Sequence, residues 1–364
     1  MRLDAWRRIR ALRAEPIGNA SDPSRVDDFR GALAQAEELA DAADAAGYAS
    51  NALPLFYAAE QCGRAVLEAH WRGNIADLSG HGLSYRLAQD TADPSKPDRN
   101  ILRGRVIPAR GKDGSFQAVC DAVGSPRLAG PVELGALWTA NPDLREIKIP
   151  AQFGEWQPAI SFGVGPRRAY DGMDGRPADP SKARTATGGF VALPIHMPGE
   201  TVADVKQILG RYASLADAGV IVQGPTGGVL GADSALVERG YARDGRPILT
   251  AAKTAQFSLT FEEFWAAENA LYSIVEIDHV RSEPFQAHWI GHALPDLCGQ
   301  PAPHPLMLWW ALLLGLSTLV RYHPGVWTGA INSDASVLAD PFQRLIDAAA
   351  ECVPVRLVEA LTVK

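Results

Sequence analysis

The segment HPLMLWWALLLGLSTLVRYHPGVW, residues 304–327, contains the longest apolar run of the chain. Its apolar part, Leu306–Val320, is shorter than the roughly 18 residues that a membrane-spanning helix needs. A helix that is apolar on every side is typical of a protein core. The polar and aromatic residues that follow, Arg321–Pro324, predict a tight turn where the helix ends. The segment therefore predicts a buried helix that runs into a polar turn.

The composition around this stretch is that of an ordinary globular protein. The chain has 364 residues, of which 47% are hydrophobic and 21% charged, and its formal net charge is −7. Such a chain presents no broad positive field to nucleic acid, although a local basic patch can still bind phosphates. The four cysteines are scattered and the basic N-terminus has no apolar run, so we expect a soluble, cytoplasmic protein with no membrane partner. We also expect no bound metal and no cofactor.

Helices are predicted at the N-terminal end of the chain. Val26, Phe29 and Leu33 begin an apolar stripe at helical spacing, and Gly47 ends it. A second helix is predicted over 51–71, so the two form a helical hairpin. A shorter amphipathic helix is expected before them.

The middle of the chain is predicted to be rich in strands. A β-hairpin is expected around Gly111–Gly114, with strands at 105–107 and 115–119. Further strands are expected at 159–164, 190–196 and 220–223. Helices return at 260–276, 306–320 and 341–361. This order predicts an α+β fold with helical N-terminal and C-terminal regions around a β-rich middle, divided as 1–90, 100–258 and 259–364.

Two blocks of sequence resemble a known family. One comprises His304–Trp310, Leu316–Pro324 and Trp327, and the other comprises Phe56–Ala65 and Gly80–Leu83. Together they resemble the YaaC-like proteins, a bacterial family. This resemblance implies a bacterial origin, but it brings no catalytic residues.

The N-terminal hairpin, within 1–90, is also similar to HEPN domains, many of which are ribonucleases in bacterial conflict systems. This similarity implies a ribonuclease motif made of an arginine followed closely by a histidine. Arg64 with His70 is a poor match, because the two point apart on a continuous helix. Arg281 with His288 has Pro284 between them, which breaks a helix. If the chain is a ribonuclease, Arg64, His81 and His288 are the candidate catalytic residues.

Two other polar segments contain candidate ligand-binding residues. A histidine-rich connector, Asp278–His304, includes His288 and His292 at a spacing that suits a metal, but structural histidines are the simpler interpretation. The turn after the apolar helix offers Arg321, Tyr322, His323 and Trp327 as candidate binding residues for phosphate or nucleic acid. Its structural alternative is that Arg321 stabilises the negative end of the helix. A glycine-rich loop, 223–231, has no lysine and is therefore no Walker site.

These observations lead to two functional hypotheses. The first is a non-enzymatic binding or assembly protein that engages a protein or nucleic-acid partner, in antiviral defence or a stress response. The second is a HEPN-like, metal-independent ribonuclease. The sequence leaves open whether the chain forms a homo-oligomer.

Overall fold

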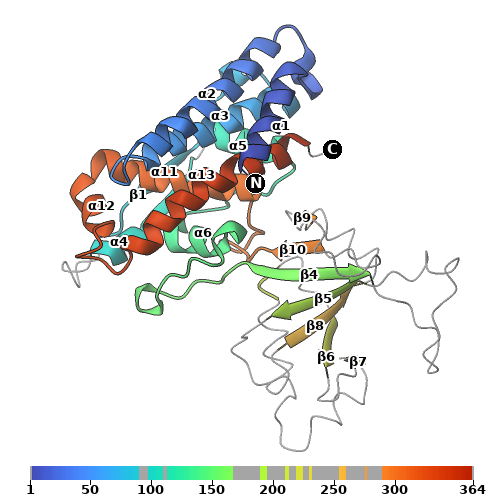
Figure 1. The fold of residues 1–364 in the computed structure, drawn as a ribbon, viewed down its shortest axis with the longest axis vertical. Coiled ribbons are helices and arrows are strands. Elements are labelled where there is room, and N and C mark those ends of the chain that lie inside the picture. The colour runs from blue at the N-terminus through green and yellow to red at the C-terminus, as the bar shows by residue number, and fades with distance from the viewer. Residues whose placement is uncertain are drawn as a thin grey trace, which may run out of the picture. The chain divides into compact units, whose positions relative to one another are not determined.

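The computed structural model describes residues 2–89, 97–109, 113–166, 189–194, 210–212, 219–223, 229–231, 254–259, 275–276 and 289–362. The chain divides into two units. Unit 1 combines 1–158 with 297–364, and unit 2 comprises 159–296. Figure 1 shows that the helices among the described residues belong to unit 1 and the larger sheet to unit 2. Helical ends around a β-rich middle confirm the predicted α+β class.

Unit 1 is a helical bundle with one small sheet. Its α-helices are α1 (Arg2–Ala14), α2 (Val26–Ala45), α3 (Ala52–His70), α4 (Pro97–Arg103), α5 (Ser115–Ala122), α6 (Leu134–Ala140), α11 (Pro305–Tyr322), α12 (Pro324–Ala330) and α13 (Ala339–Thr362). Its 3-10 helices are η1 (Gly18–Ser21), η2 (Ile75–Asp77), η3 (Pro142–Leu144) and η4 (Ala151–Phe153). The antiparallel strands β1 (Leu83–Arg86), β2 (Arg105–Pro108) and β3 (Val132–Glu133) form its sheet in the order β1-β2-β3.

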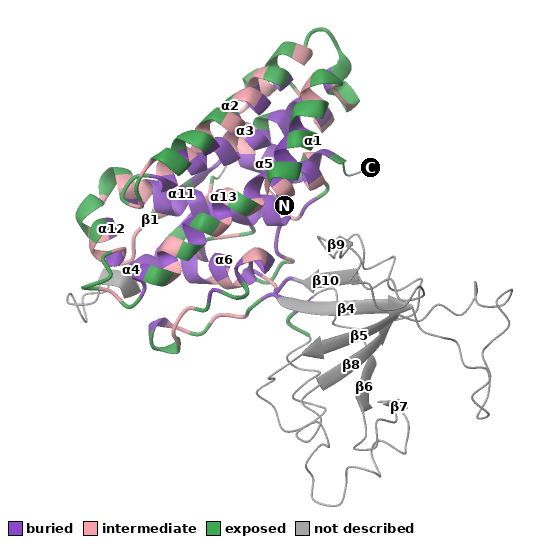
Figure 2. Cartoon of the chain, in the orientation of Figure 1, coloured by how far each residue is buried: buried purple, intermediate pink, exposed green. Residues whose placement is uncertain are grey.

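The apolar helix predicted at 306–320 is α11, the centre of unit 1. Nearly every residue of α11 from Pro305 to Leu319 is buried, and Figure 2 shows it in purple among the other helices. In the described chain it is the one helix apolar and long enough to qualify as a membrane span, and 78% of it is buried. Helix α3 packs against it through Gly63, where an added Cβ would lie 2.0 Å from the Trp310 ring. The predicted core role of this helix is therefore confirmed.

A buried ion pair joins η3 to α13. Arg356 donates from Nε to Asp143 Oδ2 at 3.0 Å, and the side chains of Arg356 and Asp143 are only 5% and 8% exposed. Trp309 of α11 donates to the same Asp143 oxygen at 2.8 Å, and Arg356 also pairs with Glu359 at 2.7 Å. Every charged group in this cluster thus has partners, as a buried charge requires.

The predicted hairpin around Gly111–Gly114 is wrong in its second strand. Residues 115–119 belong to helix α5, whose Phe116, Val119 and Cys120 are buried. Strand β2 pairs instead with β1 and β3, which lie far from it in sequence. A short apolar run does not distinguish a strand from a buried helix, and here packing against α3 decides for the helix.

Unit 2 contains a seven-stranded sheet in the order β7-β6-β8-β5-β4-β10-β9, and all its strand pairs are antiparallel. Its strands are β4 (Ile160–Pro166), β5 (Gly189–Pro194), β6 (Gly219–Gln223), β7 (Val229–Gly231), β8 (Thr254–Leu259), β9 (Val275–Glu276) and β10 (Trp289–Ala293). The strands predicted at 159–164, 190–196 and 220–223 are confirmed as β4, β5 and β6.

The packing groups the chain differently from the predicted division into 1–90, 100–258 and 259–364. Strand β10 pairs with β4, so part of the predicted C-terminal region belongs with the sheet. The last residues of the helix predicted at 260–276 form strand β9, and the rest of that segment lies outside the described residues. The two helical ends meet in one unit because α11 packs against α3.

Candidate functional site

The loop that carries His81 is fixed by the N-terminus of α5. The first N–H groups of a helix have no partner within the helix. Here the Ser115 N–H donates to the Gly80 carbonyl at 3.0 Å, and the Phe116 N–H donates to the His81 carbonyl at 3.1 Å. The loop therefore serves as the cap of α5, which holds the His81 backbone in one place.

Two glycines allow this close approach. Gly82 has a φ of +78°, which disfavours other residues, and an added Cβ there would lie 2.0 Å from Gln117 Oε1. A Cβ at Gly114 would lie 2.3 Å from the Gly82 backbone. The buried Gln117 side chain joins the two, since it accepts from the Gly114 N–H at 3.1 Å and donates to the Gly82 carbonyl at 2.8 Å.

Glu60 of α3 orients the His81 ring. His81 Nδ1 donates to Glu60 Oε1 at 2.5 Å. The imidazole also packs edge-on against the ring of Phe56, with a distance of 5.5 Å between the two ring centroids. The hydrogen bond to Glu60 raises the pKa of His81 above 6.5, while burial and the charge of Arg321 act in the opposite direction. Within the described chain, no residue hydrogen-bonds to Nε2 of His81, and the side chain is 38% exposed. The imidazole can therefore exchange a proton with a ligand or with water through Nε2.

Arg321, in the last turn of α11, lies within electrostatic range of His81. Its Nε donates to the Ser317 carbonyl at 3.3 Å, and it pairs with no carboxylate of the described residues. Its guanidinium lies 5.2 Å from the centroid of the Tyr322 ring, and Tyr322 is 67% exposed. We refer to Glu60, His81, Arg321 and Tyr322 together as the His81 site.

Arg64 lies one helical turn after Glu60, on the same face of α3. Its guanidinium is exposed and lies 3.8 Å from the carboxylate of Asp28. His70, the alternative partner of Arg64, is instead held by α13, since its Nε2 lies 3.0 Å from the Leu361 carbonyl oxygen. The structure therefore does not bring Arg64 and His70 together, because Arg64 pairs with Asp28 and His70 contacts α13.

The other predicted binding residues divide between surface and core. His323 is half-buried at the junction of α11 and α12, where its side chain makes no capping hydrogen bond to α12. Trp327 is fully buried, and its Nε1 donates to the Tyr48 carbonyl at 3.1 Å. This differs from the predicted binding role of Trp327, because an indole enclosed in the core is not available to a ligand. Its ring packs against Phe342 at a centroid distance of 5.4 Å.

The histidine-rich connector does not form one site among the described residues. His279, Arg281 and His288 lie outside them, and His292 belongs to strand β10. His304 is buried at the start of α11, where its Nδ1 accepts from the Leu306 N–H at 3.2 Å. Burial lowers the pKa of His304 to about 3, so this ring is neutral and structural. No group of three or more metal-binding side chains occurs in the described part of the chain.

Sequence reasoning identified His81 and Arg321 separately but missed Glu60, the residue that orients His81. One sequence signal was available for Glu60. It lies four residues before Arg64 on a predicted helix, so both charged side chains were expected on the same helix face. Comparison of the sequence with protein-family models and curated proteins, and of the fold with solved structures, finds no match. The YaaC-like and HEPN-like resemblances therefore stay predictions.

Proposed function

We propose that this protein binds single-stranded RNA at the His81 site. The observation that supports this function most is that Arg321 lies within electrostatic range of the oriented His81 ring, although the two residues come from distant parts of the chain. A guanidinium binds phosphate well, and an exposed aromatic ring such as that of Tyr322 can stack on a base. The oriented imidazole of His81 adds a donor for a phosphate oxygen or a ribose hydroxyl.

The charge of the chain favours a local contact rather than an extended one. With a net charge of −7, the protein gains little from long-range attraction to a polyanion. Each phosphate neutralised on a single strand contributes a salt slope of about −0.7. We therefore expect a shallow salt dependence that corresponds to one or two phosphates. We propose, as part of the same function, that this binding serves a defence or stress response in the bacterial cytoplasm. The resemblances to YaaC-like proteins and to HEPN domains support this part of the proposal.

Fluorescence anisotropy with end-labelled, mixed-sequence single-stranded RNA tests the binding. Arg321→Ala should weaken the affinity by about tenfold, since it removes a charge-assisted hydrogen bond. Arg344→Ala is the matched control, because Arg344 is an exposed arginine of α13 whose pairing with Asp340 at 3.8 Å involves no residue of the His81 site. Equal affinities of wild type and Arg321→Ala would refute the proposal.

The Glu60–His81 hydrogen bond favours one further candidate, a metal-independent ribonuclease. No nucleophilic serine or cysteine belongs to the His81 site, and RNA can supply its own nucleophile. In this reaction His81 Nε2 takes the proton of the ribose 2′-hydroxyl, and the 2′ oxygen bonds to phosphorus. The bond from phosphorus to the 5′ oxygen breaks, and that oxygen takes a proton from water. Arg321 stabilises the charge on the phosphoryl oxygens.

Cleavage is tested by incubating RNA with the wild type in the presence of a chelator. The ribonuclease candidate predicts 2′,3′-cyclic phosphate ends, which His81→Ala should abolish. His288→Ala serves as the comparison, because His288 is a candidate from sequence alone. Equal and negligible cleavage by all three proteins contradicts the ribonuclease candidate. The RNA-binding proposal is tested separately, by the anisotropy measurement.

A further inference from the structure

A polar cavity lies where the end of α3 and the turn after it meet the start of α2. Its volume is about 540 Å³, enough for a small organic molecule. The wall includes charged side chains of both signs and an isoleucine of η2: Arg25, Asp28, Arg64, Glu68, Arg72 and Ile75. None of these residues belongs to the His81 site, so this cavity, which we call the Glu68 cavity, is a separate candidate for binding.

The carboxylate of Glu68 is the feature that points to a ligand. The Glu68 side chain is only 4% exposed, yet no group of the described chain donates a hydrogen bond to it, and neither of its oxygens is sealed from solvent. Arg25 lies 3.8 Å away, but its N–H groups donate to backbone carbonyls at the end of α3 and in the turn that follows. A buried carboxylate needs hydrogen bonds as well as a neighbouring charge. The Glu68 carboxylate is therefore open to donors from a ligand.

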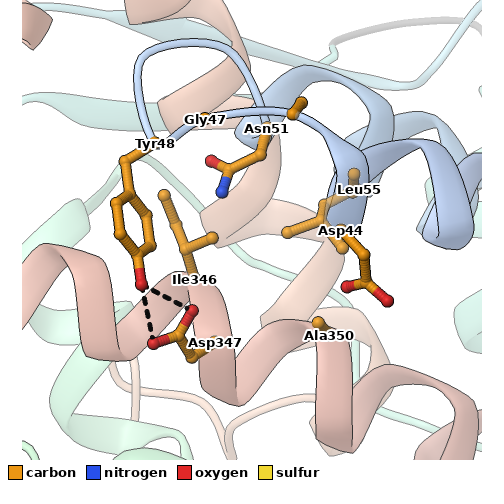
Figure 3. A pocket seen from close by; sticks show the side chains of 10 residues that line it. Asp44, Gly47, Tyr48, Asn51, Leu55, Ile346, Asp347 and Ala350 are labelled. Atoms are coloured by element: carbon orange, nitrogen blue, oxygen red, sulfur yellow. Dashed lines mark hydrogen bonds between the residues drawn. The ribbon is translucent and has the colours of Figure 1, made fainter.

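The cavity drawn in Figure 3, between the α2–α3 turn and α13, has no buried carboxylate among its wall residues in the described chain. Its two carboxylates are exposed and already have partners. Asp347 accepts a hydrogen bond at 3.0 Å from the Tyr48 hydroxyl, and Asp44 pairs with Arg2. A buried carboxylate without a donor therefore distinguishes the Glu68 cavity from the one in Figure 3.

The charges around Glu68 select a ligand that carries both signs. Burial and the nearby Asp28 carboxylate raise the pKa of Glu68, while the charges of Arg25 and Arg64 lower it. Arg72 is exposed, and its guanidinium has no ion pair or hydrogen bond among the described residues. A simple cation would meet three arginines in this wall, and a simple anion would be repelled by the Glu68 carboxylate.

We propose that the Glu68 cavity binds a free α-amino acid with an apolar side chain. The ammonium group of the ligand donates to the Glu68 carboxylate, and its carboxylate pairs with the guanidinium of Arg72. The apolar side chain lies against Ile75 and Ala76, which supply the apolar part of the wall. In a peptide the two charged groups belong to opposite ends of the chain, so the cavity selects the free amino acid.

Isothermal titration of the full chain with L-leucine tests this assignment. We expect saturable binding of leucine. Two analogues that each lack one charged group, 3-methylbutan-1-amine and 4-methylpentanoate, should bind at least about tenfold more weakly. Glu68→Gln and Arg72→Ala should each weaken leucine binding by about tenfold or more, because each removes a charge-assisted hydrogen bond. Arg8→Ala is the matched control for Arg72→Ala, because Arg8 is an exposed arginine of α1 outside this cavity and has no ion pair among the described residues.

Three outcomes would overturn the proposal: absence of saturable leucine binding, equal binding of either analogue, or an unchanged leucine affinity in Arg72→Ala. Circular dichroism of both variants verifies their folding. If Glu68→Gln fails to fold, Arg72→Ala and the two analogues carry the test, because Arg72 is exposed and its replacement removes no contact within the described chain.

Discussion

Two polar clusters of unit 1 use the same chemistry in opposite ways. In the buried cluster, Asp143 and Arg356 are almost completely enclosed, and each has further partners. In the His81 site, Glu60 orients an imidazole that is partly exposed, and the guanidinium of Arg321 has no carboxylate in the described chain. A cluster whose hydrogen-bonding groups are all used stabilises the fold. A cluster with an unused nitrogen and an unpaired cation remains available to a ligand.

The largest effect should come from breaking the buried cluster. Arg356→Ala leaves the Asp143 carboxylate buried without its ion-pair partner, so we expect the free energy of unfolding to fall by about 3–5 kcal/mol. Denaturant unfolding followed by far-ultraviolet circular dichroism measures this, since unit 1 is a helical bundle. The double variant Asp143→Leu, Arg356→Met removes both charges and should recover part of the loss. A loss below about 1 kcal/mol in Arg356→Ala would show that the pair is not structural.

A smaller effect should follow from disturbing the loop that carries His81. Gly82→Ala introduces both an unfavourable φ and a Cβ 2.0 Å from Gln117, so we expect a loss of roughly 1–3 kcal/mol. Gly80→Ala is the control, because Gly80 has a φ of +63° but nothing within 4 Å of an added Cβ. The difference between the two variants, from denaturant unfolding, isolates the contact with Gln117. Equal losses would mean that this contact does not fix the loop.

Removing the carboxylate of Glu60 should change stability only slightly and in a pH-dependent way. Its hydrogen bond raises the pKa of His81 in the folded state, so the stabilisation is present below the unfolded pKa of about 6.5. It fades as the pH rises through the higher folded pKa. Because His81 is partly solvent-screened, the difference between wild type and Glu60→Gln should be at most about 1 kcal/mol at pH 5.5 and close to zero at pH 8.5.

His304 contributes equally to the pH dependence of stability in wild type and in Glu60→Gln, so its contribution cancels in the difference between them. Unfolding of wild type and Glu60→Gln at the two pH values provides the measurement. A difference that grows with increasing pH would contradict the assigned hydrogen bond.

The smallest effect concerns the charge of Arg321. This charge lowers the pKa of His81, so Arg321→Ala should raise that pKa, and the effect should be small because both charges are partly exposed. A titration of the His81 ring by nuclear magnetic resonance detects such a shift. Arg344→Ala should leave the same titration unchanged. An identical His81 pKa in wild type and Arg321→Ala would show that Arg321 does not act on His81, so the two residues would not belong to one site.

The sequence was informative where one segment determines its own structure. The run Leu306–Val320 is apolar on all sides, so its burial follows from composition. Residues 115–119 were predicted incorrectly because eight residues of α5 are too few for periodicity to decide, and contacts with α3 and with the His81 loop select the helix.

The candidate site depends on contacts between segments, which spacing alone does not reveal. His81 meets Glu60 because the glycines at 82 and 114 bring the loop against α5. Arg321 reaches the same place from the other end of the chain. Trp327 follows the turn in sequence, which suggested a surface position, but α12 turns its indole toward Phe342 and Tyr48.

The most direct test of the RNA-binding proposal is a nuclear magnetic resonance titration of the histidine ring nitrogens with single-stranded RNA. We expect the Nε2 resonance of His81 to move saturably in the wild type, and to need a much higher RNA concentration to move in Arg321→Ala. The buried ring of His304 should not respond. If His81 Nε2 stays unchanged while anisotropy shows the RNA to be bound, the RNA binds elsewhere and the proposed role of the His81 site is wrong.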